Sequence, residues 1–88
     1  MWKNTTSYTK GEERSEIRTT SINVDGLKLT VTKYSGYENQ LVMHCHALGI
    51  STKDLDETDM EKAQLKAIEI VKAKAKRILY AIEHYVFN

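Results

Sequence analysis

The chain has 88 residues, with 13 Lys plus Arg against 12 Asp plus Glu and a formal net charge of +1. This near-neutral balance argues against a strongly cationic nucleic-acid-binding coat and against an acidic mimic of DNA. The length predicts one small domain. A domain of this size buries little more than about 60% of its unfolded surface, so docking onto another chain would stabilise it.

The cellular compartment is indicated by the cysteine content and by the N-terminal residues. Cys45 is the single cysteine in the sequence, so no disulfide can form within the chain. The N-terminal residues are polar where a signal peptide would be apolar, and no apolar run approaches the ~20 residues of a membrane span. We expect a cytoplasmic protein that does not contact a membrane.

The first half of the chain predicts an N-terminal arm followed by a β-hairpin. Residues 1–14 are polar without a period of 2 or 3.6, which is typical of a flexible arm. Residues 16–24 are rich in β-branched side chains, residues 27–34 alternate, and Asp25-Gly26 between them is a strong turn signal. A two-residue turn sets the register of the two strands, with Val24 opposite Leu27 and Ile22 opposite Leu29.

A third strand is predicted over residues 40–48, followed by a connecting loop over residues 49–55. Alternation places Leu41, Met43 and Cys45 on one face of this strand. One apolar face of the sheet must then be covered, and the C-terminal helix remains to cover it. Residues 15–88 therefore form a single α+β domain, a three-stranded antiparallel meander packed against one long C-terminal helix.

The helix is predicted over residues 56–87, with Asp56 as its N-cap and no internal Gly or Pro. It would reach about 45 Å, against about 25 Å for the strands, so part of it has no sheet to cover. Within the domain, its apolar stripe is expected to bury Ile78 against Leu29.

Part of that stripe follows the alternating three- and four-residue steps of a coiled-coil seam. A stripe that packs only on the sheet would show much the same pattern. The excess length favours packing on another chain, either a second copy or a different protein, and we expect a homodimer. The predicted dimer seam is formed by Ile68, Val71, Ala75, Ile78, Ile82 and Tyr85.

Two of the three histidines lie on one predicted strand, at positions 44 and 46. Alternation points His44 and His46 to the same face, as in zinc sites that present two imidazoles to one ion. His84, however, lies on the outer face of the helix, and Cys45 points into the core. We therefore expect no metal site and no cofactor.

The outer face of the helix carries cations interleaved with aromatic groups. Residues 72–77 contain four cations and no acid. Such a surface suits an acidic protein and also suits the phosphates and bases of a nucleic acid. Either partner remains open at this point, and the predicted partner-binding residues are Lys72, Lys76, Arg77, Tyr80 and His84.

Catalysis has no sequence support. No motif pairs a serine or cysteine with a histidine, no glycine-rich phosphate loop occurs, and the acids before the helix are explained by capping. We expect a protein that is not an enzyme and has no catalytic residues.

One stretch of the chain resembles a known family. Residues 27–71 (LKLTVTKYSGYENQLVMHCHALGISTKDLDETDMEKAQLKAIEIV) contain a strand, a loop, a strand, a Leu-Gly turn at Leu48-Gly49, and a helix with spaced alanines at Ala63 and Ala67. This order resembles that of HicB-type antitoxins. The chain lacks the proline usual before Gly49, and it continues as helix where the family adds a strand. The resemblance implies binding to a protein and silencing it, so we expect a small regulatory protein that inhibits another protein by binding it.

Overall fold

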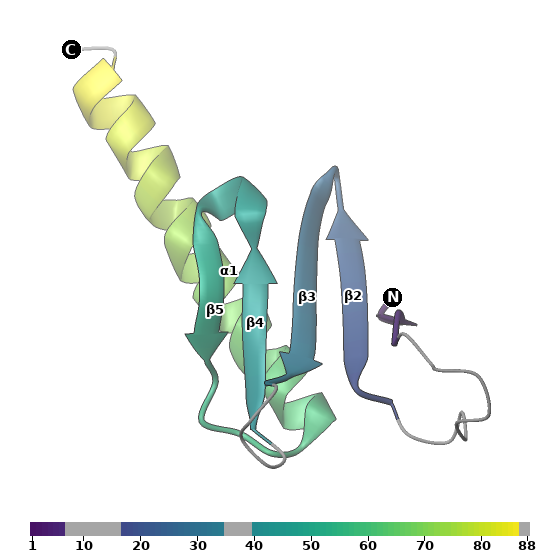
Figure 1. Ribbon diagram of the computed structural model, residues 1–88. Coiled ribbons are helices and arrows are strands. Elements are labelled where there is room, and N and C mark those ends of the chain that lie inside the picture. The colour runs from purple at the N-terminus through teal and green to yellow at the C-terminus, as the bar shows by residue number, and fades with distance from the viewer. Residues whose placement is uncertain (7–16, 35–39, 87–88) are drawn as a thin grey trace.

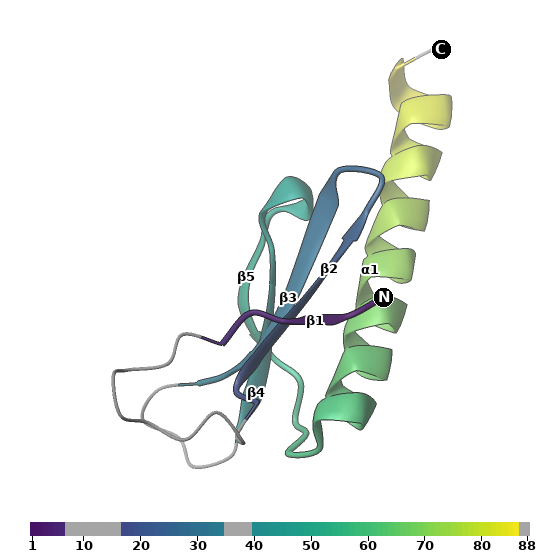
Figure 2. The ribbon, with the colours of Figure 1, turned by 90° about the vertical axis from the view of Figure 1, so that its right-hand side faces the viewer.

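The computed structural model describes residues 1–6, 17–34 and 40–86. It is an α+β fold of two layers, an antiparallel sheet and one long C-terminal helix that covers one face of the sheet (Figures 1 and 2).

The sheet has five strands, so the prediction of a three-stranded meander is wrong. Neighbours in sequence are neighbours in the sheet, and every pair is antiparallel. The two strands that the sequence pattern did not predict are the two edges. The strands are β1 (Lys3–Asn4), β2 (Thr19–Val24), β3 (Leu27–Lys33), β4 (Leu41–Cys45) and β5 (Ile50–Asp54).

The predicted hairpin and its register are confirmed. Val24 pairs with Leu27, and Ile22 pairs with Leu29. Both turn residues have a positive φ, 52° at Asp25 and 85° at Gly26, as the tight turn between twisted antiparallel strands requires.

β4 ends at Cys45 rather than at Leu48. A 3₁₀ turn, η1 (His46–Leu48), follows it, and Gly49 closes that turn in the left-handed region at φ 71°. The chain then returns as β5, where a loop was predicted. Four of the five β5 residues are exposed, so the strand lacks the alternation that marks a half-buried strand.

β1 brings the start of the predicted N-terminal arm into the sheet. Lys3 pairs with Ser21 and Asn4 with Thr20, while Trp2 packs against the core. Residues 7–14 of the arm lie outside the described residues.

The helix α1 (Met60–Ala81) begins four residues later than predicted. Asp59 is the N-cap, because its side chain accepts a hydrogen bond of 3.0 Å from the backbone N–H of Lys62. Asp56 is not the N-cap, because its φ of 50° lies outside the extended region that an N-cap residue typically adopts. A π-helical turn, η2 (Ile82–Val86), extends α1, and Phe87 lies outside the described residues.

The core lies between α1 and the strands β3 and β4. Ala63 and Ala67 are fully buried, and their small side chains let the helix approach the sheet closely. The expected contact between Leu29 and Ile78 is wrong, because Leu29 is 2% exposed and Ile78 is 36% exposed. The C-terminal part of α1 extends beyond the end of the sheet (Figures 1 and 2). The buried core residues are Leu29, Val31, Leu41, Met43, Cys45, Leu55, Ala63 and Ala67.

Candidate functional site

The part of α1 that extends beyond the sheet, together with η2, carries an unusual concentration of exposed apolar side chains. We call residues 75–86 the overhang, because the described apolar residues that pack against the core end at Val71. A helix that served only its own core would bury such residues, so this segment is a candidate binding surface. The exposed large apolar and aromatic residues of the overhang are Ile78, Leu79, Tyr80, Ile82 and Tyr85, with exposed fractions from 36% to 76%.

All five predicted partner-binding residues are exposed. The rings of Tyr80 and His84 lie one helical turn apart, with 4.0 Å between centroids and 30° between planes. Tyr85 meets Tyr80 edge-on at 6.3 Å, and Arg77 lies one turn before Tyr80. The amino group of Lys72 lies 3.5 Å from a carboxylate oxygen of Glu69. The structure thus brings the aromatic and cationic groups of the predicted site together on one face of one helix.

The predicted dimer seam divides into two parts. Ile68 and Val71 are half-buried and pack against the core. The other four residues are exposed on the overhang: Ala75, Ile78, Ile82 and Tyr85.

An apolar groove of about 260 Å³ lies between the β2–β3 hairpin and α1. Sequence reasoning did not identify it, although the exposed Val24 at the hairpin end (59%) marks an apolar face left uncovered. The groove adjoins the seam, because two seam residues line it. Its lining consists of Ile22, Val24, Leu27, Leu29, Ile68, Val71 and Lys72.

The histidines at positions 44 and 46 lie next to each other, although only His44 is on a strand, β4, and His46 begins η1. The rings of His44 and His46 are nearly parallel, with 6.3 Å between centroids. The Nδ1 atom of His44 accepts a hydrogen bond of 3.1 Å from the backbone N–H of Thr52, which orients its ring. Among the described residues, no three His, Cys, Asp or Glu side chains gather closely enough to hold a metal ion. The absence of a metal stays a prediction.

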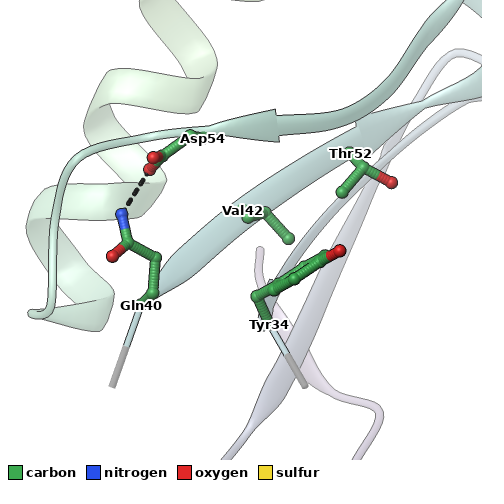
Figure 3. Close-up of a pocket in the computed structure, with 5 residues that line it drawn as sticks. All are labelled: Tyr34, Gln40, Val42, Thr52 and Asp54. Atoms are coloured by element: carbon green, nitrogen blue, oxygen red, sulfur yellow. Dashed lines mark hydrogen bonds between the residues drawn. The ribbon is translucent and has the colours of Figure 1, made fainter. Parts of the chain in front are cut away.

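A second hollow, of about 350 Å³, lies on the sheet face away from α1 (Figure 3). At its rim, Asp54 accepts hydrogen bonds from the side-chain amide of Gln40 at 2.6 Å and from the backbone N–H of Asp56 at 2.7 Å. These donors, the backbone one first, lower the pKa of Asp54 below its ordinary value. Tyr34 and Thr52 flank Val42 in this hollow. The Asp54 carboxylate therefore already serves to hold β5 to the start of β4. The sequence did not predict this hollow because it did not predict β5.

A second carboxylate, Glu57, holds the segment between β5 and α1. Its burial acts to raise its pKa, but backbone N–H groups of Asp59 and Thr58 and the charge of Lys66 together bring the pKa below its ordinary value. The amino group of Lys66 lies 3.6 Å from Glu57 and also donates to the carbonyl oxygen of Leu55. These contacts give Glu57 a structural role in holding the segment before α1. The overhang therefore remains the strongest candidate site.

Comparisons of the chain with family models, with curated proteins and with solved structures find no match. In the described part of the chain, no helix combines the length and the apolar character that crossing a membrane requires.

Proposed function

We propose that this protein is a small, non-enzymatic regulatory protein that acts by binding another protein through the outer face of α1. The observation that carries the proposal is the exposed Tyr80–His84 ring pair beside Arg77, on a helix segment beyond the sheet. Tyrosine and arginine gain most from desolvation at a protein interface and are enriched among the residues that dominate binding energy.

The charge of this face indicates the chemistry of the partner. Lys76 and Arg77 are exposed, and no acid lies between Glu69 and Glu83. The partner we propose presents an acidic surface around a pocket for the ring of Tyr80. In line with the resemblance to HicB-type antitoxins, binding would inhibit that partner.

The experiment is capture of the partner with matched variants. The wild-type chain and the Arg77→Ala/Tyr80→Ala variant are immobilised in parallel and exposed to the same lysate. Lys53→Ala, which removes a cation from the distant strand β5, is the control. A protein retained by the wild type and by Lys53→Ala but lost with the double variant supports the proposal. A protein retained equally by all three chains rejects this face as the site.

Nucleic acid is the second candidate partner, favoured by the four cations within residues 72–77. The salt dependence of binding separates the two candidates. Phosphate contacts make affinity fall steeply as salt rises, whatever the base sequence. An interface with an apolar centre keeps most of its affinity.

We also propose that the chain forms a homodimer, supported by the exposed apolar part of the dimer seam on the overhang. The proposed location is the cytoplasm, supported by the single cysteine, Cys45, which is a buried free thiol.

A further inference from the structure

An exposed stripe on α1 follows coiled-coil spacing but differs from the predicted dimer seam. Leu65 is 66% exposed, Leu79 56% and Ile82 43%, although all three are apolar. Together with three further residues they form six positions in steps of three, four, three, four and three. We call these positions the heptad stripe: Leu65, Ile68, Lys72, Ala75, Leu79 and Ile82.

We infer that the heptad stripe binds the same stripe of a second copy of this chain, with the two α1 helices antiparallel. The inference rests on the proposed self-association, and it specifies the surface, the orientation and the register. In an isologous dimer, if a residue of the first copy contacts a given residue of the second copy, the same contact occurs with the two copies exchanged. The pattern of an antiparallel pair must therefore match itself when reversed.

The stripe meets this condition, because its steps read the same in both directions. An antiparallel pair therefore places Leu65 opposite Ile82 of the second copy. Ile68 then lies opposite Leu79, and Lys72 lies opposite Ala75, whose small side chain leaves room for the lysine stem. A single lysine at such a position is a known means of fixing register.

Charges beside the stripe support the antiparallel orientation. Lys62, Glu69, Lys76 and Glu83 recur at intervals of seven residues, with alternating sign, on the flank away from the sheet. In the antiparallel register, Glu69 of each copy lies beside Lys76 of the other, and Lys62 lies beside Glu83. In a parallel pair these positions would instead face Gln64, Val71 and Ile78, which carry no charge.

The opposite flank of the stripe explains the apolar groove. In the same register, Ile78 of the second copy lies opposite Val71, which lines the groove beside Ile22 and Val24. The overhang of each copy would thus cover the groove of the other. One arrangement accounts for both the apolar groove and the exposed apolar residues of the overhang.

The dimer would leave three of the five proposed partner-binding residues open, because Lys72 lies within the heptad stripe and Lys76 lies beside it. At 100° per residue, Arg77, Tyr80 and His84 point more than a quarter turn away from the heptad stripe. Two copies of these three residues would then be available to a partner.

Charge reversal at Glu69 and Lys76 tests the register, because the register places each of these residues beside the other in the second copy. Both residues lie within α1. Glu69→Lys and Lys76→Glu each replace two attractive pairs by two repulsive ones, and each should weaken the dimer by about tenfold. An equimolar mixture of the two variants restores opposite charges at both pairs and should recover dimers of wild-type affinity. Arg77→Glu is the matched control, since it makes the same charge change one residue further along the helix. The side chain at this position points away from the heptad stripe.

Sedimentation equilibrium at micromolar concentrations gives the mass of each sample. The expected wild-type mass is twice that of the 10.1 kDa chain. A wild-type mass of 10.1 kDa throughout would overturn both the register and the self-association. A wild-type dimer that Lys76→Glu and Arg77→Glu weaken equally, or that mixing does not restore, would overturn the antiparallel register alone. None of these results bears on partner capture, which depends on Arg77 and Tyr80.

Discussion

The side-chain amide of Gln64 donates a hydrogen bond of 3.0 Å to the hydroxyl of Thr20, across the boundary between the helix and the sheet. Thr20 is only 6% exposed, and its hydroxyl also lies 3.4 Å from the sulfur of Met60. The contact joins β2 to the first two turns of α1. It gives a largely apolar interface a directional bond, which satisfies the buried hydroxyl of Thr20.

Removing one member of this pair should destabilise the fold. Gln64→Ala leaves the buried Thr20 hydroxyl without its amide donor, and we expect the free energy of unfolding to fall by about 1–3 kcal/mol. Urea denaturation measures this loss. Replacing both groups by apolar ones, Thr20→Val with Gln64→Leu, should cost less than the two single changes added together. Strict additivity would contradict the coupling.

Leu29 and Ile78 should differ sharply in their effect on stability. Leu29→Ala opens a cavity in the core and should cost about 2–4 kcal/mol. Ile78→Ala removes a side chain that is already 36% exposed beyond the sheet, and it should cost well under half as much in dilute protein. Equal losses in thermal unfolding would show that the helix packs on the sheet further along than the structure indicates.

The hairpin was predictable because its signals are local. Asp25-Gly26 supplies the two left-handed residues of the turn, and the turn length then fixes the pairing of Ile22 with Leu29. Only nearby residues take part, so no knowledge of the rest of the fold was required.

The edge strands and the helix start depended on tertiary context. β5 has one half-buried residue, Ile50, so its hydrogen bonds to β4 leave no alternating pattern in the sequence. Both Asp56 and Asp59 are acceptable N-caps by type, and the backbone path out of β5 decides for Asp59.

The residue types of the candidate site were predictable from the sequence, but their position relative to the sheet was only partly predictable. The helical period places Arg77, Tyr80 and His84 on one face without any structure. The period does not show where the sheet ends, so it assigned both Ile78 and Leu79 to the apolar stripe that covers the sheet. It gave no reason to separate Leu65 from an ordinary solvated surface.

Acid should destabilise the junction of β4 and β5. The pKa of Asp54 lies below its ordinary value of 3.8 in the folded chain, so the ionised group stabilises the fold above that pH. This contribution is lost as the pH falls through the lowered pKa. The free energy of unfolding should therefore decrease from pH 6 to pH 3, and by less in Asp54→Asn. An identical decrease in the variant would contradict a role for this carboxylate.

The purified protein should contain no stoichiometric zinc. His44 and His46 supply two ligands at most, whereas structural zinc sites use four and catalytic sites use three with a water. Inductively coupled plasma mass spectrometry measures the content directly. One zinc ion per chain that disappears in the His44→Ala/His46→Ala variant would show that a second copy or another segment completes a site.

The most direct test of the proposed function is the affinity of the captured partner for variants of the outer α1 face. Isothermal titration calorimetry at about 0.15 M and 0.5 M salt should show a wild-type affinity that changes little between the two conditions. Arg77→Ala and Tyr80→Ala should each weaken binding by about 1–3 kcal/mol without changing the unfolding midpoint, because both side chains are exposed. Lys53→Ala should bind as the wild type does. Wild-type affinity in both the Arg77 and the Tyr80 variants would contradict the proposal that this protein acts through that face.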